Sequence, residues 1–197
     1  MPPHFYTDAD GYFYILPVFN GLERPPMTDN PRFAILEDRG ILAVSGPDRT
    51  DFLQGLVSND ISKVAPGHAV YAALLTPQGK YLHDFFMFRH QGALWLDCEG
   101  LRTDDLLRRL ARYKLRAKVE MADAGGELSV FALLGEGACD ALGLSDGTGA
   151  AAAFGGGIAY ADPRIAAIGA RAALPPGQAA EFLVAAGFKA GTAADIK

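Results

Sequence analysis

Asp84 is the residue whose type and setting point most directly to chemistry. It lies in the segment 80–89, which alternates like a β-strand but is apolar on both faces. An ionised carboxylate on such a strand is costly unless it is paired with a cation or meets a polar ligand. The sequence leaves three interpretations open: a salt bridge with a buried arginine, a strand end that emerges into water, and a carboxylate that binds a ligand.

A basic segment at 101–118 is the second candidate. It carries seven lysines and arginines against two aspartates, within a chain whose formal net charge is −5. Its cations are Arg102, Arg108, Arg109, Arg112, Lys114, Arg116 and Lys118. A basic segment of this kind is usually a solvated surface, and the alternative is a binding site for an anionic tail or a phosphate. The acidic remainder of the chain argues against nucleic acid and anionic membranes as partners.

Other common kinds of site are not indicated. The cysteines Cys98 and Cys139 lie far apart, with no histidine or second cysteine at ligand spacing, so we expect no metal bound by this chain. No phosphate-binding glycine loop, nucleophile elbow or membrane-spanning apolar run occurs. The low cysteine count and an N-terminus too acidic for a transit peptide predict a cytoplasmic protein, and the Ala/Gly-rich second half suggests a bacterial source.

The elements that must position these residues are short strands mixed with helices. The expected strands are 33–36, 40–44, 69–76, 80–89, 94–98, 115–121, 128–134, 158–160 and 168–174. The expected helices open after residues 45–48, at Thr103 and near residues 138 and 178. The first two strands are expected to pair as a hairpin, and the Gly/Ala-rich stretch 145–157 is expected to be a loop. Without a strict βαβ alternation, the pattern predicts an α+β class with mixed or antiparallel sheets.

The chain divides most naturally at Ala124-Gly125-Gly126. Residues 1–31 are proline-broken and read as an extension of uncertain structure. Residues 32–124 then form a first α+β domain, and residues 125–197 form a second, smaller α+β subdomain.

Four segments, in this order, resemble the glycine-cleavage T-protein superfamily and its YgfZ-like branch. They are FLQGLVSNDI at 52–61, YAALLTPQGKYLHD at 71–84, LARYKLRAKV at 110–119, and DPR at 162–164 with GAR at 169–171. The first two are shared by both branches, and the last two are closer to the YgfZ-like branch. The Lys-Gly-Cys-Tyr-x-Gly-Gln-Glu segment and C-terminal β-barrel of YgfZ-like proteins have no counterpart in this sequence.

The resemblance implies a folate cavity in which Asp84 faces tetrahydrofolate or a derivative. Tyrosine rings could stack on the ligand, and arginines could meet its carboxylates. The implied folate-binding set is Asp84, Asn59, Gln54, Tyr71, Tyr113, Arg112 and Arg116. The leading hypothesis is a non-catalytic accessory protein that supports iron–sulfur cluster assembly or repair, with iron–sulfur enzymes or assembly factors as partners. The alternative is a tetrahydrofolate-dependent aminomethyltransferase of the T-protein type.

Overall fold

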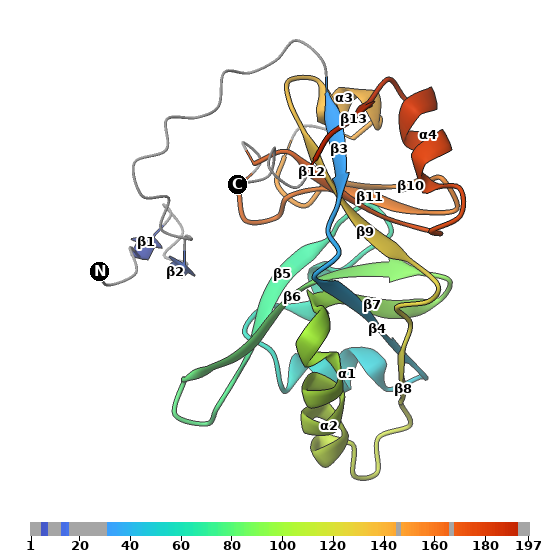
Figure 1. Cartoon of the computed structure of the whole chain (residues 1–197). Coiled ribbons are helices and arrows are strands. Elements are labelled where there is room, and N and C mark those ends of the chain that lie inside the picture. Colours follow the sequence, from blue (N-terminus) through green and yellow to red (C-terminus); the bar gives the residue numbers. More distant parts are fainter. Residues whose placement is uncertain (1–4, 8–12, 16–30, 145–146, 166–167, 193–197) are drawn as a thin grey trace.

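The structure is a computed structural model, which describes residues 5–7, 13–15, 31–144, 147–165 and 168–192. Figure 1 shows two main β-sheets that meet near the middle of the molecule, with helices on their outer sides. A separate pair of short antiparallel strands, β1 (Phe5–Thr7) and β2 (Phe13–Ile15), comes from the expected N-terminal extension. The rest of that extension lies outside the described residues.

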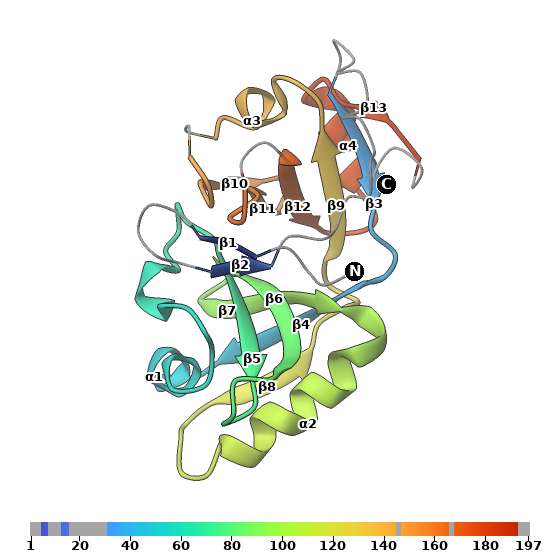
Figure 2. The ribbon, with the colours of Figure 1, turned by 90° about the vertical axis from the view of Figure 1, so that its left-hand side faces the viewer.

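The first sheet carries Asp84. Within the described residues it has five antiparallel strands in the order β5-β6-β7-β4-β8. Their bounds are β4 Arg39–Ser45, β5 Val70–Leu75, β6 Tyr81–His90, β7 Ala93–Glu99 and β8 Glu120–Asp123. Helices α1 (Arg49–Gln54) and α2 (Thr103–Tyr113) cover one face together with the 3-10 turn Ile61–Lys63, and a second 3-10 turn, Gly100–Arg102, leads into α2. Figure 2 shows this sheet and α2 in the lower half of the molecule.

The second sheet lies in the upper half of the same view and supplies the other wall of the junction. Its described strands follow the order β10-β11-β12-β9-β3-β13, and only the β13–β3 pair is parallel. Their bounds are β3 Arg32–Ile35, β9 Ser129–Leu134, β10 Ala151–Phe154, β11 Gly157–Ala161, β12 Ala170–Leu174 and β13 Lys189–Ala190. Helices α3 (Ala138–Ala141) and α4 (Ala179–Ala185) pack on its outer face.

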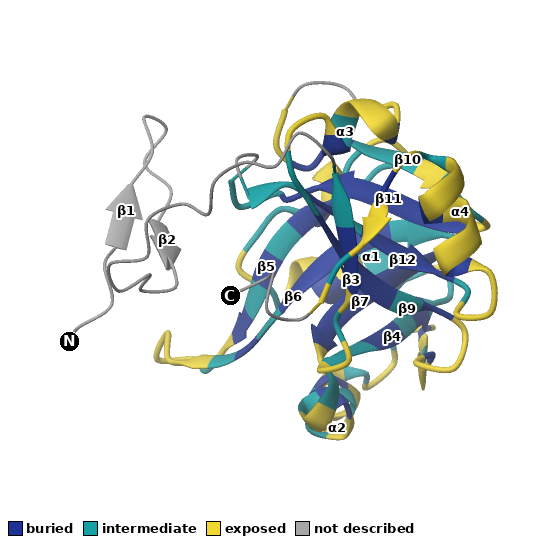
Figure 3. Ribbon diagram, turned by 45° about the horizontal axis from the view of Figure 1, so that its top comes forward, coloured by how far each residue is buried: buried dark blue, intermediate teal, exposed yellow. Residues whose placement is uncertain are grey.

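Side-chain alternation along β6 divides its residues between two cores. Phe85 and Met87 point into the core under α1 and α2, whereas Phe86 and Phe88 point into a separate apolar cluster between the two sheets. Tyr160 of β11 meets that cluster, with its ring 6.1 Å from Phe86 and 5.6 Å from Phe88. Figure 3 shows the strands on both sides of the junction as buried. By the same alternation Asp84 belongs to the junction face.

The α+β class with antiparallel and mixed sheets is confirmed, and the described strands form no closed barrel. The hairpin expectation is wrong: β3 pairs with β9 in the second sheet, and β4 pairs with β7 and β8 in the first. Two adjacent strands can join different sheets because the turn at Leu36–Arg39 redirects the chain between them. Strand β3 therefore precedes the proposed boundary near residue 124 in the sequence but belongs to the second sheet. The division into two domains at that boundary remains a proposal.

Two further expectations need correction. The strand expected at 115–121 begins only at Glu120, because a turn closed by the Ala117 N–H to Lys114 carbonyl bond of 2.7 Å occupies its first half. Part of the expected loop 145–157 is strand β10, whose small side chains allow it to pair along β11. Residues 145 and 146 of that loop lie outside the described residues.

Candidate functional site

The Asp84 carboxylate is held between two tyrosine hydroxyl groups. Tyr71, on the neighbouring strand β5, donates to Oδ2 at 2.6 Å, and Tyr81 donates to Oδ1 at 2.8 Å. Burial alone would raise the pKa of Asp84, but these donors and the nearby guanidinium groups of Arg39 and Arg164 hold the pKa below its usual value. Asp84 is therefore an ionised carboxylate at neutral pH, only partly removed from water.

The two tyrosines remain protonated donors over the whole neutral range. Burial, with the hydrogen bond to Asp84 as a second cause, raises the pKa of Tyr81 to about 12 and that of Tyr71 further. Tyr71 is partly buried against the Phe86 ring, 5.1 Å between centroids, and Tyr81 is about half exposed. The Asp84 carboxylate is therefore bonded by Tyr71 on its buried side and by Tyr81 at the protein surface.

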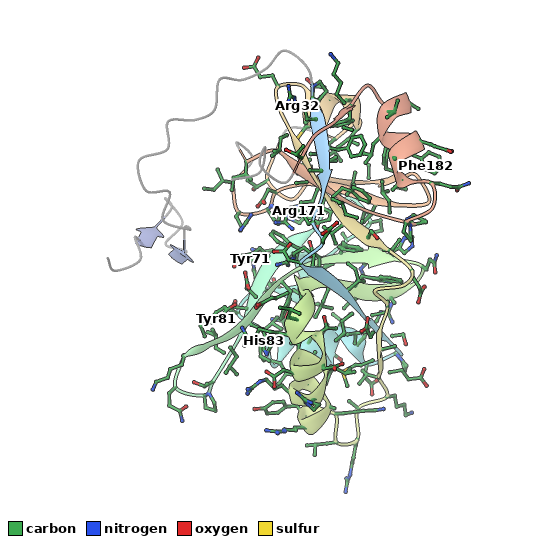
Figure 4. The ribbon with its side chains drawn as sticks, in the orientation of Figure 1. Arg32, Tyr71, Tyr81, His83, Arg171 and Phe182 are labelled. Atoms are coloured by element: carbon green, nitrogen blue, oxygen red, sulfur yellow. The ribbon has the colours of Figure 1, made fainter. Side chains whose placement is uncertain are left out.

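Three guanidinium groups surround the Phe86 ring beside this carboxylate. The Cζ atoms of Arg171, Arg164 and Arg39 lie 4.1, 4.9 and 5.7 Å from the ring centroid. Arg164 also lies over the Tyr71 ring at 5.6 Å. Contacts of this kind are favourable because the ring face carries negative potential. They bring cations from both sheets to the junction, as Figure 4 shows for Arg171 above Tyr71.

Two buried aspartates hold these arginines in place. Asp97 of β7 accepts from Arg39 Nε at 2.6 Å, from Arg171 at 3.0 Å and from the Tyr160 hydroxyl at 3.0 Å. Asp162 forms a two-pronged pair with Arg164, through Nε at 3.0 Å and a terminal nitrogen at 2.7 Å. Three carboxylates and three guanidinium groups thus balance in charge, and Asp84 is the one without a direct arginine partner in this cluster.

A glycine lets the chain bring Arg164 and Arg171 to the same place. Gly169 has φ +106°, and a Cβ there would lie 2.4 Å from the Leu133 carbonyl oxygen. Its own carbonyl accepts from the Asp162 N–H at 3.0 Å, which closes the segment between the two arginines. The DPR and GAR motifs are therefore joined by a backbone hydrogen bond, and the arginine of each lies over Phe86 of β6.

Gln54 and Asn59 shape the scaffold behind this site. The Gln54 side chain accepts from the Ile61 N–H at 2.7 Å, and Asn59 donates to the Tyr71 carbonyl at 2.9 Å. Ser58 adds backbone and side-chain bonds to Ala73. These contacts close the outer edge of β5 and fix the strand from which Tyr71 reaches Asp84. A direct contact of Gln54 or Asn59 with a ligand stays a prediction.

Tyr113, Arg112 and Arg116 lie elsewhere. They are exposed residues at and beyond the end of α2, which covers the opposite face of the first sheet from Asp84. Tyr113 lines a hollow of about 280 Å³ together with the end of β5 and the turn after it. The structure does not bring this trio to Asp84, and its assignment to a folate site also stays a prediction.

The sequence interpretation missed most of the charged cluster. Asp97 lies in a run as apolar as that around Asp84, so the same cost of burial applied to it. Arg164 and Arg171 were noticed only as parts of motifs, and Arg39 and Tyr160 gave no local signal. Their roles depend on two sheets meeting, which no short spacing in the sequence records.

The described residues contain neither a metal-ligand group nor a membrane-spanning helix. No group of three or more His, Cys, Asp or Glu side chains there could hold a metal ion. No helix in the part of the chain that the structure describes is long and apolar enough to cross a membrane.

The fold and motifs define a member of the glycine-cleavage T-protein superfamily. The profile of the GCVT N-terminal domain matches residues 37–153, more than half of the chain, and the chain belongs to this family. It is similar to the human protein described as iron–sulfur cluster assembly factor IBA57, mitochondrial, with 34% identity over 151 residues that cover 69% of this chain and 41% of that protein. A homologue from Chaetomium globosum is 34% identical over 119 residues, 49% of this chain and 26% of that protein.

The chain thus matches between about a quarter and two fifths of the length of these relatives. The relatives' names overturn the expected cytoplasmic location, because they describe mitochondrial proteins. Among solved structures, the glycine cleavage aminomethyltransferase T of Bartonella henselae superimposes with TM-score 0.62 and 15% identity, covering 95% of this chain and 55% of that one. Heterotetrameric sarcosine oxidase from Corynebacterium gives TM-score 0.53 and 12% identity over 79% of this chain and 81% of that one. At such identities these two structures establish the fold alone.

Proposed function

We propose that this protein binds a tetrahydrofolate and acts as an accessory factor in iron–sulfur cluster assembly. The observation that carries the proposal is the ionised, partly accessible Asp84 carboxylate, oriented by Tyr71 and Tyr81 in a chain whose relatives are named as assembly factors. A carboxylate suits a pterin because it accepts hydrogen bonds from ring N–H groups. It can also stabilise a positive charge on a one-carbon nitrogen.

Arg164 is the cation best placed to meet the same ligand. Arg39 and Arg171 are both committed to the fully buried Asp97, whereas Arg164 is 21% exposed and lies over the Tyr71 ring. Its pair with Asp162 fixes the plane of the guanidinium group, which favours directional bonds to a ligand carbonyl or carboxylate. Asp84 and Arg164 would then contact the ligand from the two sheets.

Calorimetric titration with tetrahydrofolate tests the binding half of the proposal. The wild-type chain should bind saturably, and Asp84→Asn should weaken binding by roughly 10-fold or more, the usual effect of losing a charged hydrogen-bond partner. Asp104→Asn, the same change at an exposed site on α2, is the matched control and should bind like the wild type. A folded wild-type chain without binding, or equal binding by Asp84→Asn, would remove the proposal.

The assembly half is tested in the cell. Deleting the gene from its host should lower the activity of iron–sulfur enzymes, and the plasmid-borne gene should restore it. Unchanged activities in the deletion strain would contradict this role.

The aminomethyltransferase alternative has in its favour the match to the GCVT N-terminal domain and a fold similarity at 15% identity. Its test is the formation of methylene-tetrahydrofolate from an aminomethyl-loaded carrier protein. We expect none.

A further inference from the structure

The loop between α2 and β8 holds a leucine in an unfavourable position. Leu115 has φ +40°, a left-handed conformation that is uncommon for a bulky side chain, and it is 89% exposed. The turn bond from Ala117 N–H to the Lys114 carbonyl fixes this conformation at the tip. Burial of the leucine side chain against the described residues does not compensate this strain. Strained residues of this kind are concentrated at functional sites.

Uncompensated positive charge surrounds the same tip. Arg112, Lys114, Arg116 and Lys118 flank Leu115, and none of them forms an ion pair with another residue that the structure describes. Earlier in the same basic segment the pattern differs, because Arg109 bonds to Asp105 at 2.7 Å and Arg102 pairs with Glu99. The charge that remains free in segment 101–118 is therefore concentrated at its C-terminal end.

A hollow of about 440 Å³ opens beside this tip. Its walls are Gly46, Pro47, Lys114, Ala117, Lys118, Val119 and Glu120. Two lysines thus line a concave surface to which a proline, an alanine and a valine contribute apolar atoms. Such a combination of concave apolar surface and a few charged groups is typical of a site that receives a side chain.

We propose that residues 112–120, with the adjoining hollow, form a docking surface for an acidic segment of a partner protein that also carries apolar side chains. Four free cations complement the acidic residues, while Leu115 and the hollow take the apolar ones. The concavity beside Leu115 favours a protein segment as the occupant, because a side chain can fill it whereas the surface of a bilayer would leave it empty. The neighbouring edge strand β8 carries Glu120 and Asp123, and such charges discourage an added strand, so the segment is recognised through its side chains.

This docking surface is separate from the Asp84 site, although Arg112, Tyr113 and Arg116 within it also belong to the predicted folate-binding set. It lies at the end of α2, on the opposite side of the first sheet from Asp84, and shares no residue with the junction cluster. Leu115→Asn changes no residue of the predicted folate-binding set, so this variant should lose docking and still bind tetrahydrofolate with unchanged affinity.

The test is fluorescence anisotropy with a labelled peptide of alternating Glu and Leu. Wild-type protein should bind it saturably and more weakly as salt rises. Leu115→Asn, and the double change Lys114→Glu with Arg116→Glu, should each weaken binding by at least about fivefold. The matched controls are Leu101→Asn, at another highly exposed leucine, and Lys80→Glu with Lys189→Glu, which changes the net charge equally at distant exposed sites. Both controls should bind like the wild type.

Leu115→Asn should remain folded, because asparagine tolerates φ > 0 better than leucine. Circular dichroism checks this directly. A Gln-for-Glu peptide and a Ser-for-Leu peptide should both bind more weakly than the probe. No binding of the probe, or equal losses in the controls, would overturn the proposal. So would a preference for phosphatidylserine-containing vesicles or a short DNA duplex that depends on the same residues, since either would assign the surface to another class of partner.

Discussion

Asp84 and Asp97 lie on neighbouring strands at the junction, but their carboxylates have different surroundings. Asp97 is fully buried and receives bonds from two arginines and a tyrosine, so its charge is neutralised by the protein itself. Asp84 receives only two neutral hydroxyl groups and keeps part of its surface in water. One aspartate therefore joins the sheets, and the other remains available to a ligand.

Asp97→Ala should be among the most damaging single changes in this chain. It would leave Arg39, 15% exposed, without its carboxylate partner and Arg171, equally exposed, with only its 3.8 Å contact to Asp162. Breaking one side of a buried ion pair costs about 3–5 kcal/mol of unfolding free energy. Urea unfolding would measure this loss against Asp104→Ala, an exposed control that should stay within about 0.5 kcal/mol of the wild type. A loss of similar size in both variants would contradict this role for Asp97.

Tyr81 provides a spectroscopic reading of the Asp84 site. Burial and the bond to Asp84 raise its pKa to about 12, so the difference in ultraviolet titration between wild type and Tyr81→Phe should show a phenol that ionises near that value. Asp84→Asn should lower the pKa, because the neighbouring negative charge is gone. The folded-state pKa exceeds the unfolded value of about 10, so this contribution to stability is present below pH 10 and lost as pH rises toward 12. An unchanged phenol titration in Asp84→Asn would contradict the contact.

At the scale of elements, Gly169, directly before β12, decides how the second sheet places Arg171 at the site. Gly169→Ala should misplace Arg171, since the new Cβ would lie 2.4 Å from the Leu133 carbonyl in a backbone conformation with φ +106°. A strained non-glycine residue costs on the order of 1–3 kcal/mol before the overlap is relieved. Thermal unfolding would show the loss. Gly126→Ala is the matched control, because a Cβ there meets open space and its φ lies outside the left-handed region. Equal stability of the two variants would refute the argument.

Elements with their own periodicity could be predicted from the sequence, and contacts between elements could not. The strand at 80–89 and the helix from Thr103 to Tyr113 follow from side-chain pattern, and the structure places them within a residue of expectation. The segment 115–121 alternates like a strand, yet its first residues form a turn, because local hydrogen bonding at Lys114–Ala117 prevailed over the pattern. The sequence of a single strand was enough to predict that burying the Asp84 carboxylate is costly. Its neighbours Arg39 and Arg164 come from distant parts of the chain, so only the folded structure reveals them.

At the scale of the whole molecule, the two sheets share an apolar interior between them, in addition to the core that each sheet has under its own helices. The cluster between them takes Phe86 and Phe88 from the first sheet and Ile158 and Tyr160 from the second. Arg171 of β12 bonds to Asp97 of β7 across the same junction. Separating the sheets would expose this apolar surface and leave the ion pair open, so each half would lose part of its stabilisation without the other.

This shared interior predicts a single cooperative unfolding transition. The chain has one tryptophan, Trp95, which is buried in the junction cluster on β7, while far-ultraviolet circular dichroism reports the backbone of both sheets. In urea the two signals should change with the same midpoint and slope, as expected for a two-state domain. Arg171→Met, which removes the charge but keeps much of the side-chain volume, should lower both midpoints together. If the fluorescence midpoint shifted apart from the dichroism midpoint, in the wild type or in this variant, the sheets would be separate folding units and the junction a surface contact.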